Sequence, residues 1–404
     1  VTYTGLMTMK APLFSVLLPT YNRLDLLTRA IETVRRQNFE DWEIVVSDNY
    51  SHEPIGAFIE SLDDQRIKYV RTESFIPVTD NWQNALNHSC GEYVIMLGDD
   101  DGLLQNYFAK LSELIVKHDA PEVIYTGALL YAYPNVIPGC TDGFLRSYKN
   151  RQIYQNSTLP FLLEKTSAHQ LVADSMNFRV NFDYNMQFSL VSRKLIDRLK
   201  DKGDFYQTPY PDYYASNVIM LTANDILVVP DPLVIVGISP KSFGYYYFNN
   251  AESEGNKFLN NSASANSSEV QSEQLLPGPE MNTSWLYSME RVAQNCQKLT
   301  SLTPNYERYR LIQICAAFTD LACNKPGAEE RLVDVKSLLN KQEIEKYYQK
   351  LNQWFEQTSE EEKPKLASKF SSFAASHPPV AMPKIEGKFE TILDVFNNID
   401  LTGN

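Results

Sequence analysis

Three consecutive aspartates, Asp99, Asp100 and Asp101, directly follow the apolar run 93–97. Carboxylates this close repel one another, and they are costly to bury unless a cation compensates them. Two interpretations are open at this point: an exposed acidic turn, or a site that shares a divalent metal. Gly98 and Gly102 flank the triplet and give the backbone the freedom that a tight metal-binding turn needs.

A further acidic residue, Asp48, ends the apolar run 43–48. A carboxylate only accepts hydrogen bonds, so it suits the N3–H of uracil or thymine and leaves the N3 acceptor of cytosine unpaired. Guanine could also donate to it. The alternative is an aspartate that caps a loop at the end of a strand.

Short apolar runs alternate with helical patterns in the first hundred residues. The pattern predicts strands at 14–19, 43–48, 66–70 and 92–97, and helices at 25–37, 54–62 and 80–88. This alternation is typical of βαβ units and a mostly parallel sheet. Ligands of such sheets gather beyond the carboxyl ends of the strands, where both Asp48 and the triplet fall.

The patterns along the whole chain predict three units. Further strands are expected at 123–133 and 187–191, and two short ones within 226–238, where Pro230-Asp231-Pro232 breaks the run. Helices are expected at 193–199, 211–221, 306–323, 328–340 and 342–356. We therefore predict an α/β domain at 1–248, a linker or mobile loop at 249–283, and a helical C-terminal domain at 284–404.

Composition narrows the class of ligand and the compartment. The 404 residues carry a net charge of −13 and no block of five basic residues, so nucleic-acid binding is not expected. A phosphorylated ligand would instead need a divalent cation. Five scattered cysteines without CxxC spacing favour reduced thiols. With neither a signal peptide nor a membrane span in the sequence, we expect a cytoplasmic protein, and peripheral contact at the inner face of a membrane stays open.

The motifs at the strand ends resemble those of family 2 glycosyltransferases of GT-A fold. They are Thr20-Tyr21-Asn22-Arg23, Val46-Ser47-Asp48-Asn49, and the block that runs from Asn81-Trp82 through Gly91-Glu92-Tyr93 to Asp99-Asp100-Asp101. Their order and spacing match over 13–103, more loosely over 187–245, and not beyond 250. The resemblance implies a GT-A, Rossmann-like, mostly parallel sheet flanked by helices.

The resemblance also implies a nucleotide-sugar site. The residues expected to bind the donor nucleotide are Pro19, Thr20, Tyr21, Asn22, Arg23, Asp48, Asn81, Asp99, Asp100, Lys241 and Ser242. Mn²⁺ or Mg²⁺ would be held by Asp101 and Asp99, and which of the two is the principal ligand stays open. Family members often carry an aspartate where this chain has Gly98. The metal would bridge the diphosphate and neutralise the leaving nucleotide.

Inverting transfer needs a base that removes the proton of the acceptor hydroxyl. In the family this base is an acidic residue at the start of a helix, and Pro211-Asp212 occupies that place. We predict Asp212 as the base, with Asp183 and Asp174 as reserve candidates. The alternative for Asp212 is a helix N-cap, which is a common role for aspartate.

The predicted function is metal-dependent, inverting transfer of a sugar from a UDP- or dTDP-sugar to a hydroxyl of a glycan or carrier-linked acceptor, as in surface polysaccharide synthesis. Two alternatives stay open: a nucleotidyltransferase, and a non-catalytic assembly protein of the same fold. The first would need a Gly-rich basic loop after strand one, which Leu18-Pro19-Thr20-Tyr21-Asn22 lacks. The helical unit at 284–404 could mediate oligomer or membrane contact.

Overall fold

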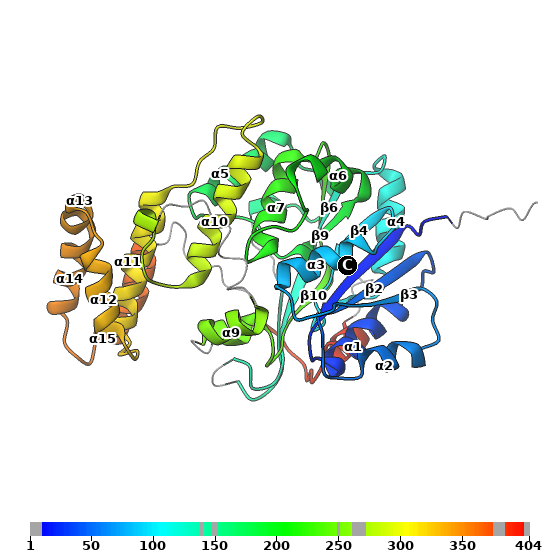
Figure 1. Cartoon of the computed structure of the whole chain (residues 1–404), viewed down its shortest axis with the longest axis horizontal. Helices are drawn as coiled ribbons and strands as arrows, with labels where there is room; N and C mark the ends of the chain where they lie inside the picture. Colours follow the sequence, from blue (N-terminus) through cyan, green and yellow to red (C-terminus); the bar gives the residue numbers. More distant parts are fainter. Residues whose placement is uncertain are drawn as a thin grey trace, which may run out of the picture.

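The N-terminal half alternates strands and helices, as the sequence predicts. The structure is a computed structural model that describes residues 10–137, 140–147, 152–248, 251–260, 272–374 and 384–399. Its first elements are β1 (Phe14–Thr20), α1 (Leu24–Arg35), β2 (Trp42–Asp48), α2 (Ile55–Ser61), β3 (Ile67–Arg71), α3 (Val78–Asn87), β4 (Tyr93–Met96), β5 (Gly102–Leu103) and α4 (Tyr107–Lys117). Figure 1 shows the helices packed around the sheet.

The sheet is parallel in its N-terminal part and mixed beyond it. The order β11-β7-β6-β9-β4-β1-β2-β3 places β3, β2, β1 and β4 side by side, all parallel. The other strands on this path are β6 (Val123–Ala132), β7 (Phe144–Ser147), β9 (Ser189–Ser192) and β11 (Lys384–Ile385). Strand β9 runs antiparallel between β4 and β6. The predicted GT-A arrangement of a mostly parallel sheet flanked by helices is confirmed.

One expectation for the sheet was wrong: 226–238 is a single strand, β10 (Ile226–Ile238), and not two. It pairs with β6 in parallel, with register shifts on either side of Pro232. Two prolines lack the N–H groups that a regular ladder needs, so the strand bulges there instead of ending. Its second half continues past the bulge and pairs with β5, next to the aspartate triplet.

The strand ends meet at one edge of the sheet. In the β1–β2 register Thr20 lies opposite Asp48, and in the β1–β4 register Leu17 lies opposite Met96. The residues that follow Met96 therefore reach the same edge as Thr20. Parallel strands are buried on both faces, and every residue of β1, β2 and β4 is buried here.

The predicted linker at 249–283 contains regular structure. Helix α9 (Glu252–Leu259) follows α8 (Phe243–Phe248), and α10 (Glu280–Asn295) begins before the predicted end of the linker. Residues 249–250 and 261–271 of this stretch lie outside the described residues. The Asn, Ser and Glu content that suggested a linker did not exclude a short helix held by its few apolar residues.

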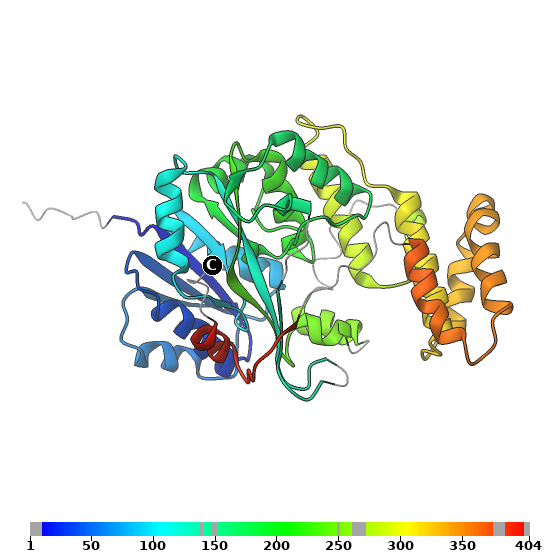
Figure 2. The same ribbon diagram turned by 180° about the vertical axis from the view of Figure 1, so that it is seen from behind.

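The C-terminal part packs in two places. Helices α11 (Tyr306–Ala322), α12 (Ala328–Ser337), α14 (Gln349–Glu356) and α15 (Lys363–Ala374) share a core of their own around Phe318 and Phe370. Helix α10 instead packs on α7 (Pro211–Thr222) and places Trp285 in the core of the sheet domain. The residues after α15 also return to the sheet: β11 pairs with β7, and α16 (Ile392–Asn398) packs on α1 (Figure 2).

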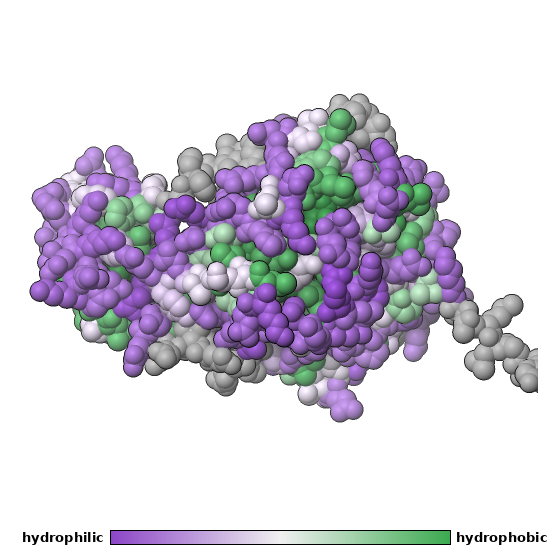
Figure 3. Space-filling model, turned by 90° about the horizontal axis from the view of Figure 1, so that it is seen from above, coloured by the Kyte–Doolittle hydropathy of each residue, from purple (hydrophilic) through white to green (hydrophobic). Residues whose placement is uncertain are grey.

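The helical end of the molecule is mostly polar on the face seen in Figure 3. Within the described parts of the chain, no helix is both long and apolar enough to cross a bilayer.

Candidate active site

One cavity of about 310 Å³ lies at the carboxyl edge of the sheet. It brings together most of the predicted site residues, namely Pro19, Thr20, Tyr21, Arg23, Asn81, Asp99, Asp100, Asp101, Asp212 and Ser242. Asn22, Asp48 and Lys241 do not line it, although each contacts residues nearby. The structure thus gathers side chains that are up to about two hundred positions apart in the sequence.

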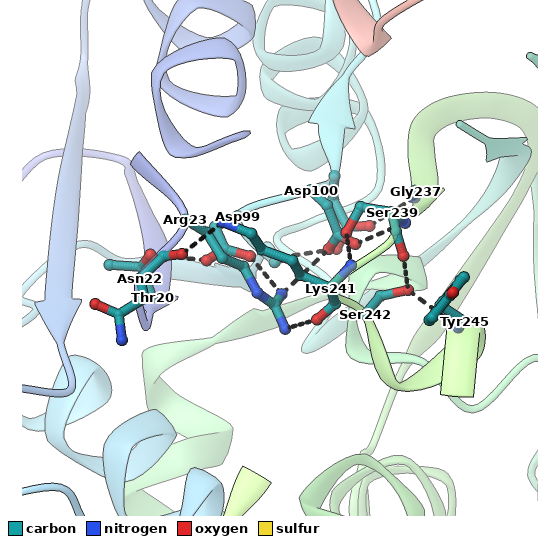
Figure 4. A network of polar contacts seen from close by, with 12 residues as sticks. Thr20, Asn22, Arg23, Asp99, Asp100, Gly237, Ser239, Lys241, Ser242 and Tyr245 are labelled. Carbon is teal, nitrogen blue, oxygen red and sulfur yellow. Dashed lines mark hydrogen bonds and ion pairs between the residues drawn. The ribbon is translucent and has the colours of Figure 1, made fainter. Parts of the chain in front are cut away.

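Asp99 is held by the end of strand β1. Its carboxylate accepts hydrogen bonds from Thr20 Oγ1 at 2.7 Å and from Arg23 Nη1 at 2.8 Å (Figure 4). Burial raises the pKa of Asp99, and the Arg23 charge and the Thr20 hydroxyl oppose that rise. The buried ion pair with Arg23 is the local compensation that the triplet required.

Asp101 is tied to three neighbouring backbone and side-chain groups. One oxygen accepts from Gly237 N at 2.7 Å, and the other from Gly98 N at 2.8 Å and Gln187 Nε2 at 2.5 Å. Burial, reinforced by the charge of Asp100, raises the pKa of Asp101 to about 7. These bonds join the turn to β10 and to the turn before β9. The structure does not test the prediction that Asp101 and Asp99 bind a metal.

Asp100 has the fewest partners of the three. Its Oδ2 accepts from Ser239 N at 3.2 Å, and its Oδ1 lies 4.0 Å from Arg23 Nη1. Strand β10 passes very close to this residue, since a Cβ at Gly237 would lie 1.9 Å from the Asp100 carbonyl oxygen. Only glycine fits at position 237, and this close approach places β10 against the triplet.

Lys241 and Asn22 link the end of β10 to the end of β1. Lys241 Nζ donates to the Asn22 carbonyl at 2.9 Å, and the Lys241 carbonyl accepts from Arg23 (Figure 4). The Ser242 hydroxyl donates to the Ser239 carbonyl at 3.0 Å. Lys241 therefore closes this end of the site through its backbone and its contact to Asn22.

Asp48 is buried in a polar network beside the cavity. Its oxygens accept from Ser51 N at 2.9 Å and Tyr69 Oη at 2.7 Å, and Arg71 Nε lies 3.6 Å away. The side chain is 1% exposed, so a nucleobase could contact it only if these hydrogen bonds rearranged. Its predicted role in base recognition stays a prediction. Sequence reasoning missed Tyr69 and Arg71, which come from the neighbouring strand β3 and carry no motif.

Asn81 has a structural contact with strand β2. Its Oδ1 accepts from Ser47 Oγ at 2.7 Å, and its Nδ2 donates to the Ser47 carbonyl at 3.1 Å. The pair fixes helix α3 to the end of β2. Asn81 thereby shapes the wall of the cavity.

Asp212 lies in the first turn of α7, and it is not the N-cap. The N-cap is Tyr210, whose side chain makes no cap hydrogen bond, so the capping alternative for Asp212 was wrong. Burial raises the pKa of Asp212 to about 7, and nearby backbone N–H groups oppose the rise. A carboxylate with a pKa near neutrality is suited to proton transfer.

The reserve candidates lie elsewhere. Asp174 is on α5 (Lys165–Met176), where it accepts from Asn181 Nδ2 at 2.6 Å and from Gln170. Neither Asp174 nor Asp183 lines the cavity. The geometry leaves Asp212 as the candidate base that faces the same space as the triplet.

Aromatic side chains that carry no sequence motif cover one part of the cavity. Tyr21 stacks on Phe75, with ring centroids 4.4 Å apart. The centroid of the Tyr21 ring lies 5.7 Å from that of the Phe258 ring of α9. The Arg23 guanidinium sits 4.7 Å from the centre of the Phe258 ring. Sequence reasoning missed Phe75 and Phe258, because one lies in a loop and the other in the stretch predicted to be a linker.

The comparison with protein families agrees with this geometry. The sequence model described as "Glycosyl transferase family 2" matches residues 15–165, which carry β1 to β8 and the aspartate triplet. This part of the chain is therefore similar to glycosyl transferase family 2.

Several bacterial glycosyltransferases are similar to this region. The chain is 38% identical over 105 residues to GalNAc(5)-diNAcBac-PP-undecaprenol beta-1,3-glucosyltransferase of Campylobacter jejuni, covering 25% of this chain and 34% of that protein. It is 32% identical over 130 residues to the putative colanic acid biosynthesis glycosyl transferase WcaA of Escherichia coli, covering 32% and 44%. The chain thus spans less than half the length of either relative.

A third relative is matched over most of its length. The Escherichia coli UDP-Glc:alpha-D-GlcNAc-diphosphoundecaprenol beta-1,3-glucosyltransferase WfgD is 22% identical over 236 residues, which are 52% of this chain and 93% of that protein. Among solved structures, residues 1–349 of Staphylococcus aureus TarS in complex with UDP align with a TM-score of 0.42 and 16% identity, over 80% of this chain and 88% of that one.

Proposed function

We propose that the protein is an inverting glycosyltransferase that moves a sugar from a uridine or thymidine diphosphate donor to a hydroxyl acceptor. One observation carries the proposal. Asp212, a carboxylate with a pKa raised to about 7, lines the same cavity as Thr20, Arg23 and the aspartate triplet. Asp212, which can accept a proton, and the Arg23 guanidinium, which can bind phosphate, therefore line one cavity. Single-displacement transfer requires both groups.

The reaction follows from these positions. The acceptor oxygen attacks the anomeric carbon while the bond from that carbon to the diphosphate oxygen breaks, and the acceptor proton passes to Asp212. The electron pair of the broken bond leaves with the nucleoside diphosphate. Arg23 lies where it can bind the diphosphate, because its Nη1 is engaged by Asp99 while its Nε has no hydrogen-bond partner among the described residues.

A divalent cation, Mn²⁺ or Mg²⁺, is part of the proposal. Within the described ranges no three His, Cys, Asp or Glu residues are grouped so as to hold a metal by themselves. One carboxylate with phosphate oxygens and water is nevertheless a common Mg²⁺ environment. We place that carboxylate at Asp100 rather than at Asp99 or Asp101, because the oxygens of the latter two are taken by Arg23, Thr20 and backbone donors. When bound, the metal would neutralise charge on the leaving diphosphate.

The acceptor class is proposed from the relatives alone. Two of them are named as transferases to diphosphoundecaprenol-linked sugars. We therefore propose a carrier-linked glycan acceptor in surface polysaccharide synthesis, with the transfer on the cytoplasmic side of a membrane. The nucleotidyltransferase alternative has no support in the described residues, because no Gly-rich basic loop follows β1.

Calorimetric titration with UDP-, dTDP-, GDP- and CMP-sugars, with Mn²⁺ or with EDTA, tests this proposal. We expect metal-dependent binding of a uridine or thymidine donor, and Asp100→Asn should weaken it by at least about tenfold. Asp231→Asn is the matched control, because Asp231 pairs with Lys110 away from the cavity. Binding that needs no metal, or that survives Asp100→Asn unchanged, would contradict the assignment.

A further inference from the structure

Gln187 is a buried amide in the wall of the cavity that no motif singled out. It lies in η2 (Met186–Phe188), a 3-10 helix of one turn directly before β9, and is 8% exposed. Its Nε2 donates to Asp101 Oδ2 at 2.5 Å. Its Oε1 is buried and has no hydrogen-bond partner among the described residues. A buried carbonyl oxygen without a partner is costly, so it points to a ligand that donates.

A second buried atom without a partner in the described part of the chain lines the same cavity. Arg23 Nε is also buried without a partner among the residues described, and Arg23 lines the same space. Arg23 Nε is a donor that suits a phosphate oxygen, whereas Gln187 Oε1 is an acceptor that a phosphate oxygen would repel. The two unsatisfied atoms therefore call for one ligand with phosphate oxygens at one end and hydroxyl groups at the other.

The surroundings of Gln187 place it at the sugar end. Its amide is fixed by Asp101, and the turn η2 packs on α7, the helix that carries Asp212. The anomeric carbon must lie near Asp212 for the proton to be transferred. A group that contacts the ligand between Asp101 and α7 therefore faces the transferred sugar, and the aromatic cover of Tyr21, Phe75 and Phe258 faces the nucleotide.

We infer that Gln187 determines donor specificity by accepting a hydrogen bond from a hydroxyl group of the transferred sugar through Oε1. This inference rests on the proposed function and extends it to the substrate class, namely a donor hexose with a hydroxyl at the contacted position. A polar site of this kind rejects an analogue that lacks the hydroxyl, because the buried oxygen is then left unpaired. The same amide also positions Asp101 through Nε2.

Donor hydrolysis with paired substrates separates these two roles. The wild type, Gln187→Met and the matched control Gln105→Met are assayed with UDP-glucose, UDP-galactose, UDP-N-acetylglucosamine, and the monodeoxy analogues of the preferred donor. Gln105 makes a comparable amide bond, to the Phe396 carbonyl at 2.8 Å, but does not line the cavity. The readout is the ratio of kcat/KM between the preferred donor and each analogue.

We expect the wild type to prefer its donor over one monodeoxy analogue by about tenfold or more. Gln187→Met should bring that ratio close to one, and Gln105→Met should leave it unchanged. Equal loss of activity with donor and analogue, at a constant ratio, would overturn the inference and leave Gln187 as a positioning residue for Asp101. A changed preference for ribose over deoxyribose, with the sugar ratio intact, would overturn it as well.

A second variant and the wild-type control separate failure of this inference from failure of the proposed function. If Gln187→Met does not fold, Gln187→Asn is used instead, because it shortens the side chain by one methylene and withdraws the amide. This variant must also bring the kcat/KM ratio between the preferred donor and the monodeoxy analogue closer to one. If the wild type neither binds nor hydrolyses any nucleotide sugar, the proposed function itself fails, and the inference falls with it. Donor turnover with unaltered ratios in every variant refutes the inference alone.

Discussion

The sheet domain and the helical unit differ in where their polar groups lie. In the sheet domain, buried charged groups such as Asp99 and Asp101 meet at one edge and line a cavity. In the helical unit the buried Arg310 pairs with Glu343 at 2.5 Å, and both line a second cavity of about 890 Å³. In the sheet-domain cavity, Arg23 Nε and Gln187 Oε1 have no hydrogen-bond partner among the described residues, whereas Arg310 and Glu343 satisfy each other. The proposed reactive groups thus lie in the sheet domain, while the helices of the helical unit pack their apolar faces into a separate core.

Elements on both sides of the helical unit pack against the sheet domain. Helix α10 contributes Trp285 to the sheet-domain core, and α16 returns to pack on α1. Gln105 Nε2, a few residues beyond the triplet, donates to the Phe396 carbonyl of α16. The helical unit proper is therefore α11 to α15, inserted between two segments that belong to the sheet.

The largest expected effect comes from Asp212, the proposed base. Asp212→Asn should lower kcat for sugar transfer by about 10²- to 10⁴-fold, because the amide cannot take the acceptor proton. Donor affinity measured by calorimetry should stay near the wild-type value. Asp174→Asn is the control, since Asp174 lies outside the cavity. Wild-type turnover by the Asp212 variant would show that another group is the base.

Two core truncations test whether the regions are separate. Trp285→Ala and Phe370→Ala should each lower the free energy of unfolding of their own region by about 3–5 kcal/mol. Trp285 contacts the aromatic rings of Tyr184 and Tyr213 beside the base, so its loss should also lower UDP-sugar turnover. Phe370→Ala should leave turnover unchanged. Equal loss of turnover in both variants, measured alongside chemical denaturation, would refute the separation.

Asp101 and Asp100 should respond differently to the same change. Asp101→Asn removes an acceptor from Gly237 N or Gly98 N, so we expect a loss of about 1–3 kcal/mol in unfolding free energy. Asp100→Asn should leave stability within about 0.5 kcal/mol, since its partners are few. Denaturant titration of both variants measures this. A larger loss of stability for Asp100→Asn would reverse the roles assigned to the two residues.

The pH dependence tests the same carboxylate without a mutation. Because the pKa of Asp212 is raised to about 7, turnover should rise roughly tenfold per pH unit up to that pH and then level off. Stability has the opposite sign. The contribution of the buried protonated acid is present below pH 3.8 and is lost as pH rises to about 7. Asp212→Asn should flatten both profiles, and an unchanged turnover profile in a variant that remains active would contradict the assignment.

Much of the fold and part of the site could be predicted from the sequence. The apolar runs that end in Thr20, Asp48 and Asp99 gave the parallel strands and their shared edge, because strand period and burial are local properties. The place of Asp212 in the first turn of a helix was predictable because a helix start is also readable locally. Pro230 and Pro232 misled the prediction of β10, since a bulge depends on the partner strand β6.

Other parts of the site depend on contacts between distant segments. Gln187 and Phe258 carry no motif, and only the packing of η2 and α9 brings them to the cavity. The sequence likewise does not show which aspartates of the triplet are hydrogen-bonded, because the donors are Arg23 and the Gly237 backbone N–H. Helix α16 could not be assigned to the sheet domain, since nothing local marks which core an apolar face will join.

A crystal structure of the protein with UDP and Mn²⁺ would test the account most directly. We predict the diphosphate beside Arg23, the metal on Asp100, and an open space for the sugar between Gln187 and Asp212. The account would be contradicted by a nucleotide bound outside this cavity, or by a metal held by Asp101 with its bonds to Gly98 and Gly237 broken.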